Sequence, residues 1–179
     1  MTERPWLDDT ERLAWVRFAA VLELLPRALD AQLERDEQLT HYDYYCLAML
    51  SEAPARTLRM TVLASMTNAT LPRLSRVMNR LEDAGYVRRE PCASDRRATN
   101  VVLTETGWDK VVRAAPGHVR TVRKLAIDTL TAEQVEQLST ISARMLTVLD
   151  PDQKVMASVL RPPSGPPIAP STINSRAPS

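Results

Sequence analysis

Apolar and polar positions alternate along this chain mainly with the spacing of helices, and the clearest such segment covers residues 70–84. Its apolar residues recur at spacings of three, one and three, which is typical of one buried helix face; they are Leu74, Val77, Met78 and Leu81. Thr70 is a suitable N-cap, and Pro72 fits the first turn because the N–H that proline lacks would have no partner there. Gly85 favours the left-handed conformation at which helices commonly end.

The polar positions of this predicted helix are basic, and the segment after it predicts a hairpin. Three arginines occupy these positions with a serine and an asparagine beside them: Arg73, Arg76 and Arg80, with Ser75 and Asn79. Two short strands are expected at residues 86–90 and 99–103, around a loop that carries Asp95, Arg96 and Arg97. A short positioning helix is expected before them, at residues 57–64. This combination is typical of a winged helix-turn-helix.

A long helix is expected on the N-terminal side of this unit. Over residues 8–36 the apolar residues step by three and four, close to a heptad repeat: Trp15, Phe18, Leu22, Leu25, Leu29 and Leu33. Such a narrow stripe suits another helix, and the pattern alone leaves open whether it packs within its own chain or forms a dimer. Pro26 should kink this helix or end its first half, because proline removes one backbone hydrogen bond.

Three more helices and a tail complete the predicted organisation. One helix begins at Thr40 and holds three of the chain's four tyrosines in its first turn. A long helix covers residues 104–129, with a kink expected at Pro116. The last helix begins at Thr131, and its predicted buried stripe is Val135, Leu138, Ile141, Met145, Val148 and Leu149. Residues 161–179 are rich in proline and serine without periodicity, which predicts a disordered tail.

The charge distribution points to a nucleic acid. The chain is 44% hydrophobic and 25% charged, close to an average soluble protein, and its net charge is only +1. Residues 1–40, however, hold nine acidic and five basic side chains, whereas residues 70–100 hold four acidic and seven basic ones. A basic patch on a nearly neutral body is the distribution expected of a nucleic-acid-binding protein.

Nothing in the sequence points to an enzyme. The chain has two histidines and four glycines, no Gly-x-Ser-x-Gly, no phosphate-binding loop, and no Cys or His residues with metal-ligand spacing. We therefore expect no cofactor and no metal. The acidic, polar start is not a secretory signal, no apolar run approaches the roughly 20 residues of a membrane span, and two cysteines are too few for a disulfide framework. We expect a cytoplasmic protein without a membrane partner.

Short motifs lie in a specific order between residues 58 and 108: Leu63-Ala64, the run from Leu74 to Glu82, Gly85-Tyr86-Val87, Asp95-Arg96-Arg97, and Leu103-Thr104-Glu105-Thr106-Gly107. In this order and spacing they resemble the MarR family of bacterial transcription regulators. The resemblance implies a mainly α fold: a winged helix-turn-helix with a two-stranded β-hairpin wing and an N- and C-terminal helical dimerisation region. Residues 8–38 and 116–150 would form the dimerisation region, 40–104 the DNA-binding domain, 104–115 a connection, and 151–179 the tail.

The resemblance also implies roles for individual residues. The family's recognition helix meets the major groove at positions that correspond here to Thr70, Pro72, Arg73, Ser75 and Arg76, where an arginine can bond to guanine. Arg80, deeper along the helix, is expected to contact a phosphate or to pair with Glu82 or Asp83.

In the wing, Arg97 is the candidate for insertion into the minor groove, where narrow A·T-rich DNA concentrates negative potential. Asp95 would brace an arginine and hold the loop, since a carboxylate near phosphate is repelled. Arg96 could take either part.

The sequence suggests two further sites. His41, Tyr42 and Tyr45 fall near the cleft in which family members often bind small aromatic acids, although the favoured interpretation is that these side chains simply pack that junction. A cysteine-based redox sensor is the less favoured idea, because Cys46 is expected to be buried and inert and Cys92, expected to be exposed in the wing, has no evident resolving partner.

We therefore expect a sequence-specific, homodimeric regulator of transcription that binds a pseudo-palindromic operator in double-stranded DNA. Repression, with release by a small aromatic or phenolic ligand, is what the family implies. The alternatives are the redox-sensing regulator and a winged-helix module for protein–protein contact, for which the outer face of helix 70–84 should be apolar.

Overall fold

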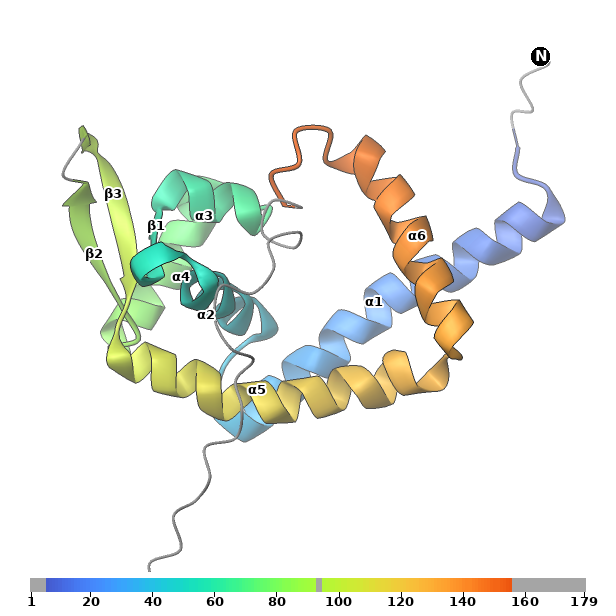
Figure 1. Cartoon of the computed structure of the whole chain (residues 1–179), viewed down its shortest axis with the longest axis horizontal. Helices are drawn as coiled ribbons and strands as arrows, with labels where there is room; N and C mark the ends of the chain where they lie inside the picture. Colours follow the sequence, from blue (N-terminus) through green and yellow to red (C-terminus); the bar gives the residue numbers. More distant parts are fainter. Residues whose placement is uncertain (1–5, 93–94, 156–179) are drawn as a thin grey trace, which may run out of the picture.

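The computed structural model describes residues 6–92 and 95–155, and the tail expected at 161–179 lies outside this range. In chain order the elements are α1 (Asp9–Glu37), α2 (His41–Glu52), a 3-10 turn η1 (Pro54–Arg56), β1 (Thr57–Arg59), α3 (Met60–Met66), α4 (Leu71–Asp83), β2 (Val87–Cys92), β3 (Asp95–Leu103), α5 (Glu105–Leu125), a 3-10 turn η2 (Ile127–Thr129) and α6 (Ala132–Leu149). The expected mainly α winged fold is confirmed (Figure 1).

The sheet has three strands, one more than the predicted hairpin. Its order is β1-β3-β2 and both pairings are antiparallel, with Thr57 opposite Val102 and Val87 opposite Leu103. The expectation of helix from residue 57 is therefore wrong, because residues 57–59 pair with β3 and the positioning helix α3 begins only at Met60. The expected loop at residues 95–97 is also strand, since Cys92 already pairs with Asp95.

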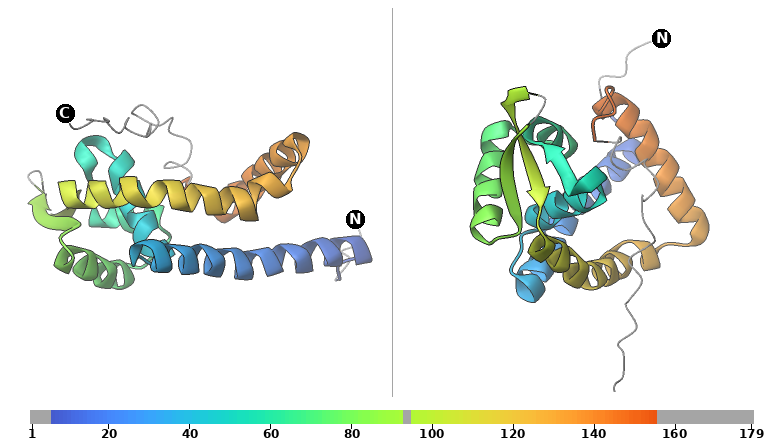
Figure 2. Two further views of the ribbon diagram at one scale, coloured as in Figure 1. Left: turned by 90° about the horizontal axis from the view of Figure 1, so that it is seen from below. Right: turned by 60° about the vertical axis from the view of Figure 1, so that its left-hand side comes forward.

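Both long helices continue through their prolines. α1 has no break at Pro26, and α5 has none at Pro116 (Figure 2). Pro26 removes only the bond to the Leu22 carbonyl, and both residues are exposed, so water can satisfy that carbonyl. The expected end of the first half of α1 is therefore wrong.

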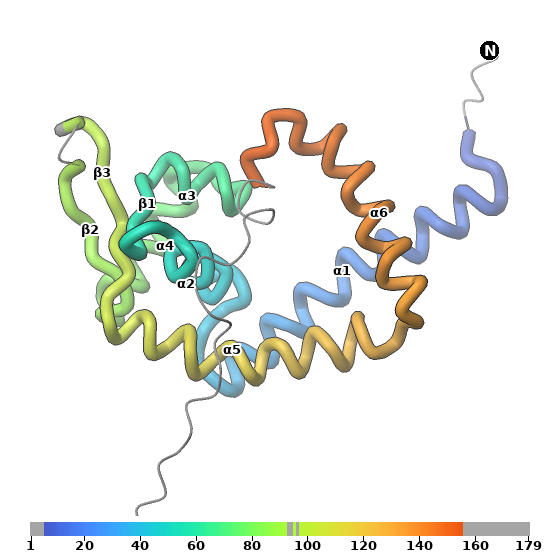
Figure 3. The backbone as a smooth tube through the Cα atoms, in the orientation of Figure 1, coloured from blue at the N-terminus to red at the C-terminus, as the bar shows by residue number. Residues whose placement is uncertain are grey.

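A close joint fixes the end of the hairpin on α5. The Thr104 hydroxyl donates to the Gly85 carbonyl at 2.7 Å, and it accepts the Gly107 N–H at 3.0 Å as the N-cap of α5. A Cβ at Gly107 would overlap the Tyr86 carbonyl, so only glycine allows this approach. Gly85 has φ +76°, the left-handed conformation expected at the end of α4. The tube in Figure 3 follows the chain from α4 through this joint into α5.

The core lies in the part of the chain from Leu39, just before α2, to the end of β3, which we call the winged lobe, and in the first turns of α5. Its buried residues include those predicted on α4, and the full cluster is Leu39, Cys46, Leu47, Leu50, Leu63, Ala64, Leu74, Val77, Met78, Leu81, Val87, Val101, Leu103 and Val111. The N-cap of α4 is Thr70, as predicted. The winged lobe therefore buries its own apolar faces.

The terminal helices α1 and α6 leave most of their apolar residues exposed in the single chain. α6 has no buried residue, so its predicted stripe is exposed in the single chain except at the half-buried Val135, with Val148 at 79% and Ile141 at 50% exposure. α1 is buried only at Leu29, Gln32 and Leu33, near its C-terminal end. The ribbons in Figures 1 and 2 show why, because α6 and the first half of α1 lie apart from the winged lobe.

Candidate nucleic-acid interface

The recognition helix α4 turns its apolar face inward and its basic face outward. The Thr70 hydroxyl accepts the Arg73 N–H at 3.4 Å, and Pro72 sits in the first turn. Leu74 and Met78 are fully buried, which leaves Pro72, Arg73, Arg76 and Arg80 exposed at the surface. An arginine and asparagine surface can bind bases and phosphates, whereas a protein-binding winged helix would present an apolar one.

The three arginines of α4 have different environments. The guanidinium carbon of Arg73 lies 4.7 Å from the centre of the Tyr42 ring. Arg80 forms an ion pair with Asp43 of α2, whose side chain is only 4% exposed. Within residues 6–92 and 95–155, Arg76 forms no ion pair, so its guanidinium is available to an outside partner.

The ion-pair partner expected for Arg80, Glu82 or Asp83, is wrong, whereas the alternative of a phosphate contact stays a prediction. Arg73 and Arg80 are seven residues apart, which is about two helical turns, so both lie on the side of α4 that faces the first turn of α2. Glu82 lies on another side of α4. Its carboxylate accepts hydrogen bonds from the backbone N–H and the side-chain Nε–H of Arg89, each at 2.8 Å. These hydrogen bonds from Arg89 hold the pKa of Glu82 below its ordinary value. Arg80 thus fastens the recognition helix to α2.

The wing lies beside α4. Ser75, half-buried, and Arg97, exposed, line the same cavity of about 320 Å³ between α4 and the sheet; its other lining residues are Met60, Thr61, Leu71, Arg89, Ala98 and Thr99. The structure therefore brings Ser75 and Arg97, predicted in separate elements, to one surface.

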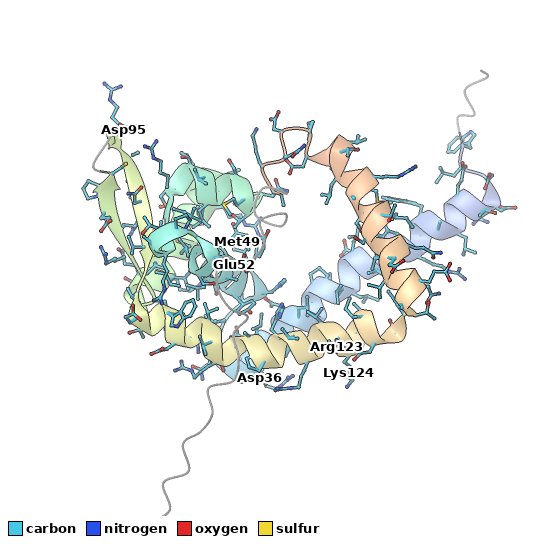
Figure 4. The ribbon with its side chains drawn as sticks, viewed as in Figure 1. Asp36, Met49, Glu52, Asp95, Arg123 and Lys124 are labelled. Atoms are coloured by element: carbon cyan, nitrogen blue, oxygen red, sulfur yellow. The ribbon has the colours of Figure 1, made fainter. Side chains whose placement is uncertain are left out.

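Asp95 lies at the tip of the wing, as the side-chain view in Figure 4 shows. Its carboxylate accepts the backbone N–H of Arg97 at 3.0 Å, so it holds the backbone of that arginine rather than its guanidinium. Arg96 lies between them in β3. Of the other wing arginines, Arg88 pairs with Glu90 and Arg89 with Glu82.

The two cysteines are buried. Burial raises the pKa of the Cys46 thiol to about 12, so the reactive thiolate is scarce at neutral pH. Cys92 is only 7% exposed, and the expectation of an exposed thiol in the wing is wrong. A register shift between Pro91 and Cys92 interrupts the alternation of β2 and turns Cys92 inward like Val87. Neither site favours redox sensing.

The three residues of the predicted ligand cleft line one cavity. His41, Tyr42 and Tyr45 of α2 face Pro26, Arg27 and Asp30 of α1 across a volume of about 360 Å³. The Tyr42 hydroxyl donates to Thr67 Oγ1 at 2.9 Å, and the Tyr45 hydroxyl donates to the Met66 carbonyl at 3.2 Å. Both tyrosines thus connect the cavity to the end of α3.

The two histidines lie together at the junction of α2 and α5. The ring centres of His41 and His118 are 5.7 Å apart, and that of Tyr44 is 4.7 Å from His118. Burial lowers the pKa of both histidines. The nearby Asp30 carboxylate partly offsets the lowering of the His41 pKa, whereas the positive charge of His41 lowers the pKa of His118 further. In both rings Nδ1 is buried without a hydrogen-bond partner among the described residues.

Sequence reasoning missed the α1 side of the cavity and the contacts of Asp43 and Tyr42 with α4. No periodicity joins residues of different helices, so no sequence signal could have found them. Among the described residues there is no group of three or more His, Cys, Asp or Glu side chains that could hold a metal ion, and no helix there is apolar and long enough to span a bilayer.

Comparison with known proteins gives consistent matches. The model of the MarR family matches residues 38–98. The HTH-type transcriptional regulator PecS of Dickeya dadantii (strain 3937) is 34% identical over 126 residues, which cover 69% of this chain and 74% of that protein.

Two solved structures from Streptomyces coelicolor are also similar. Sco3205, a MarR family transcriptional regulator in complex with DNA, is 41% identical with a TM-score of 0.81, over 86% of this chain and 96% of that one. AbsC, another MarR family transcriptional regulator, is 40% identical with a TM-score of 0.77, over 80% and 97%. These relatives are regulators and not enzymes. The chain belongs to the MarR family of transcriptional regulators.

Proposed function

We propose that this DNA-binding transcriptional regulator acts as a homodimeric repressor in the cytoplasm, that it binds a pseudo-palindromic operator, and that a small aromatic or phenolic ligand releases it. The observation that carries the proposal is the surface shared by α4 and the wing. There Ser75 and the exposed Arg97 line one cavity, and the exposed Arg76, which follows Ser75 in the chain, forms no ion pair with the residues that the structure describes. The 41% identical Sco3205 was crystallised in complex with DNA, which supports the same partner here.

The roles of the individual residues follow from their surroundings. Arg76 is proposed to bond to a guanine in the major groove, with Thr70, Pro72, Arg73 and Ser75 around it at the N-terminal end of α4. Arg96 and Arg97 are proposed to reach the minor groove, with Asp95 holding the wing tip. Arg80 is proposed to anchor α4 through Asp43 and not to contact a base.

The exposed apolar residues of α1 and α6 support a homodimer. Trp15 and Leu22 are each more than half exposed, as is Val148, and large apolar side chains that gather on exposed helices are typical of an interface. Two copies joined through these helices would place their recognition helices on successive major grooves, about 10 base pairs apart.

Selection from random double-stranded DNA, followed by fluorescence anisotropy over a salt series, tests the proposal. Arg76→Ala should cost about 1–3 kcal/mol of binding and relax the preference at one base of each half-site. Arg97→Ala should weaken binding and reduce the salt dependence. Arg88→Ala is the matched control, because Arg88 pairs with Glu90 in the same wing. A selection that yields no sequence bound more tightly than random DNA rejects the proposed operator.

The ligand is tested with phenol, benzoate and 2-hydroxybenzoate as probes. A probe that enters the cavity beside His41 and Tyr45 should raise the melting temperature of the free protein and lower its affinity for the operator. Both effects are required, because a ligand shifts the DNA-binding equilibrium only by binding the DNA-incompetent arrangement more tightly. Thermal stabilisation without release would assign the cavity to binding alone.

A further inference from the structure

Tyr42 belongs to the cavity and to the DNA-binding unit at the same time. Tyr42 lines the cavity beside His41 and Tyr45, and its ring lies under the guanidinium of Arg73. Its hydroxyl donates to Thr67 Oγ1 at 2.9 Å. Thr67 is buried, lies in the turn between α3 and α4, and donates in turn to the Leu63 carbonyl at 2.8 Å. One side chain therefore contacts the cavity, the turn and the recognition helix.

The contact with Arg73 leaves that arginine able to bind DNA. The guanidinium carbon of Arg73 lies over the Tyr42 ring, 4.7 Å from its centre, and a guanidinium has five N–H donors, none of which this contact needs as a hydrogen-bond donor. Arg73 is exposed at the N-terminal end of α4, where the helix is proposed to meet the major groove. Stacking on Tyr42 restricts the rotamers of a long side chain before DNA arrives, so less entropy is lost on binding.

The neighbouring contact strengthens the link. Asp43 follows Tyr42 in the first turn of α2 and binds Arg80, two turns beyond Arg73 on α4. Asp43 is fixed by the capping box of α2, in which it accepts the Thr40 backbone N–H at 3.1 Å and its own N–H binds the Thr40 hydroxyl at 3.0 Å. The first turn of α2 thus holds the recognition helix at two points, and only the one at Tyr42 also borders the cavity.

We propose that Tyr42 is a positioning residue: it orders Arg73 for its DNA contact and makes that contact sensitive to what occupies the cavity between α1 and α2. The inference rests on the proposed function. A molecule that displaces the Tyr42 ring from the cavity side withdraws support from Arg73 and strains the bond to Thr67. DNA affinity then falls without any change in the residues that touch DNA.

A double-mutant cycle on operator affinity tests the link between Tyr42 and Arg73. Tyr42→Leu should weaken binding about two- to five-fold when Arg73 is present, the range of an exposed cation–π contact, and should cause no further loss in Arg73→Ala. The same substitution should keep its full effect in Arg76→Ala. Tyr42→Phe, which retains the ring, should preserve the coupling.

An equal loss from Tyr42→Leu in the presence and absence of Arg73 would overturn the inference, because Tyr42 would then only support the fold. If circular dichroism shows that Tyr42→Leu is not folded, the cycle is run with Tyr42→Met, whose flexible side chain fills the space without a π face. A wild-type protein that prefers no DNA sequence would reject the proposed function, whereas an additive cycle with a specific wild type rejects only the role of Tyr42.

The cavity side is tested with a tethered ring, so that no natural ligand is needed. Arg27→Cys, labelled with benzyl methanethiosulfonate, places a phenyl group at the mouth of the cavity, and both native thiols are buried. Glu23→Cys with the same label is the matched control, because it breaks the same exposed Arg27–Glu23 ion pair (3.7 Å) outside the cavity lining.

The label at residue 27 should lower operator affinity about two- to five-fold when Arg73 is present, and should not lower it further in Arg73→Ala. Equal losses in the two backgrounds, or no difference from the label at residue 23, would contradict the coupling of the cavity to Arg73.

Discussion

The winged lobe and the terminal helices share one kind of sequence pattern and differ in what covers it. On α4, the apolar residues Leu74, Val77, Met78 and Leu81 are at most 8% exposed. On α6, residues of the same spacing stay open, with Leu138 at 41% and Leu149 at 78%. Helical periodicity therefore identifies an apolar face, but it does not identify the surface that buries it.

The difference has a physical consequence for assembly. Burial of apolar surface contributes roughly 25 cal/mol per Å². The exposed part of an apolar stripe therefore contributes nothing to stability until a second surface covers it. The winged lobe buries its core within one chain, whereas α6 and the first half of α1 keep apolar residues exposed, which the proposed dimer would cover. Stability of the lobe and assembly through the helices should therefore respond to different substitutions.

The largest effect should come from a charge in the α6 stripe. Ile141→Asp places a carboxylate on a half-exposed position that the proposed dimer buries, and burying an unpaired charge is costly. The variant should be monomeric by size-exclusion chromatography with light scattering. Its operator affinity should fall about 100-fold or more, because the second winged lobe no longer binds as part of the same molecule.

Ala143→Asp is the control for this experiment, since Ala143 is exposed and lies outside the stripe of the same helix. It should leave both the mass and the affinity as in the wild type. A dimer that persists in Ile141→Asp would place the interface elsewhere and remove the distinction between the two regions.

The second effect concerns the core of the winged lobe. Leu47 is fully buried, and Leu47→Ala should lower the free energy of unfolding by about 2–5 kcal/mol through lost burial and a cavity. In the monomeric Ile141→Asp background this loss should persist, whereas Leu138→Ala should change stability there by less than about 0.5 kcal/mol, as an exposed site does. Urea denaturation followed by circular dichroism measures both. Similar losses of unfolding free energy at Leu47 and Leu138 would mean that other residues of the same chain bury the α6 stripe.

The extent to which sequence predicts this fold follows from the range of the interactions involved. Local interactions set the ends of α4. The Thr70 cap, Pro72 in the first turn and the left-handed Gly85 all depend on neighbours within a few residues, and all three were predicted correctly. Strand β1 is not local, because Thr57–Arg59 become strand only through pairing with residues 100–102. A helix was the wrong expectation there.

The candidate site divides in the same way. Residue types and family resemblance identified which side chains gather at α4, the wing and the cavity, and the structure brings them together as groups. The contacts between groups could not be foreseen: Asp43 for Arg80, the Tyr42 ring for Arg73, and Asp30 opposite His41. These pairs join positions 11 to 37 residues apart in the sequence, where neither spacing nor propensity carries information.

A third effect, of intermediate size, should come from the anchor between α2 and α4. Arg80→Ala leaves the buried Asp43 carboxylate without its cation, although the Thr40 N–H still binds it. The free energy of unfolding should fall by about 1–3 kcal/mol, the cost of a buried polar group that loses a partner. Arg76→Ala, an exposed arginine of the same helix, should leave stability unchanged. Equal stability of the two variants in urea would show that the ion pair holds nothing in place.

The smallest effect should appear on mild acidification, at the junction where the lobe meets the long helices. Burial holds the pKa of His41 and His118 below the ordinary value of 6.5. Above that value both rings are neutral in the folded and unfolded chains. As the pH falls below it, the unfolded chain takes up protons first, so stability declines until the lower folded pKa values are passed.

Glu82 in the winged lobe should respond in a separate, more acidic window. Hydrogen bonds from Arg89 hold its pKa below 4.5, so its contribution is present above that value and is lost only as the pH falls through the folded pKa.

Melting temperatures between about pH 7.5 and pH 5.5 test the junction alone, because Glu82 stays ionised there. The free energy of unfolding of the wild type should fall by less than about 1 kcal/mol over this pH range, since both rings are partly solvated and the Asp30 carboxylate favours the protonated form of His41. His118→Gln should flatten the dependence, because it removes one of the two titrating rings. An unchanged slope in His118→Gln would assign the acid sensitivity to other groups, and would leave the junction no more sensitive to mild acid than the lobe.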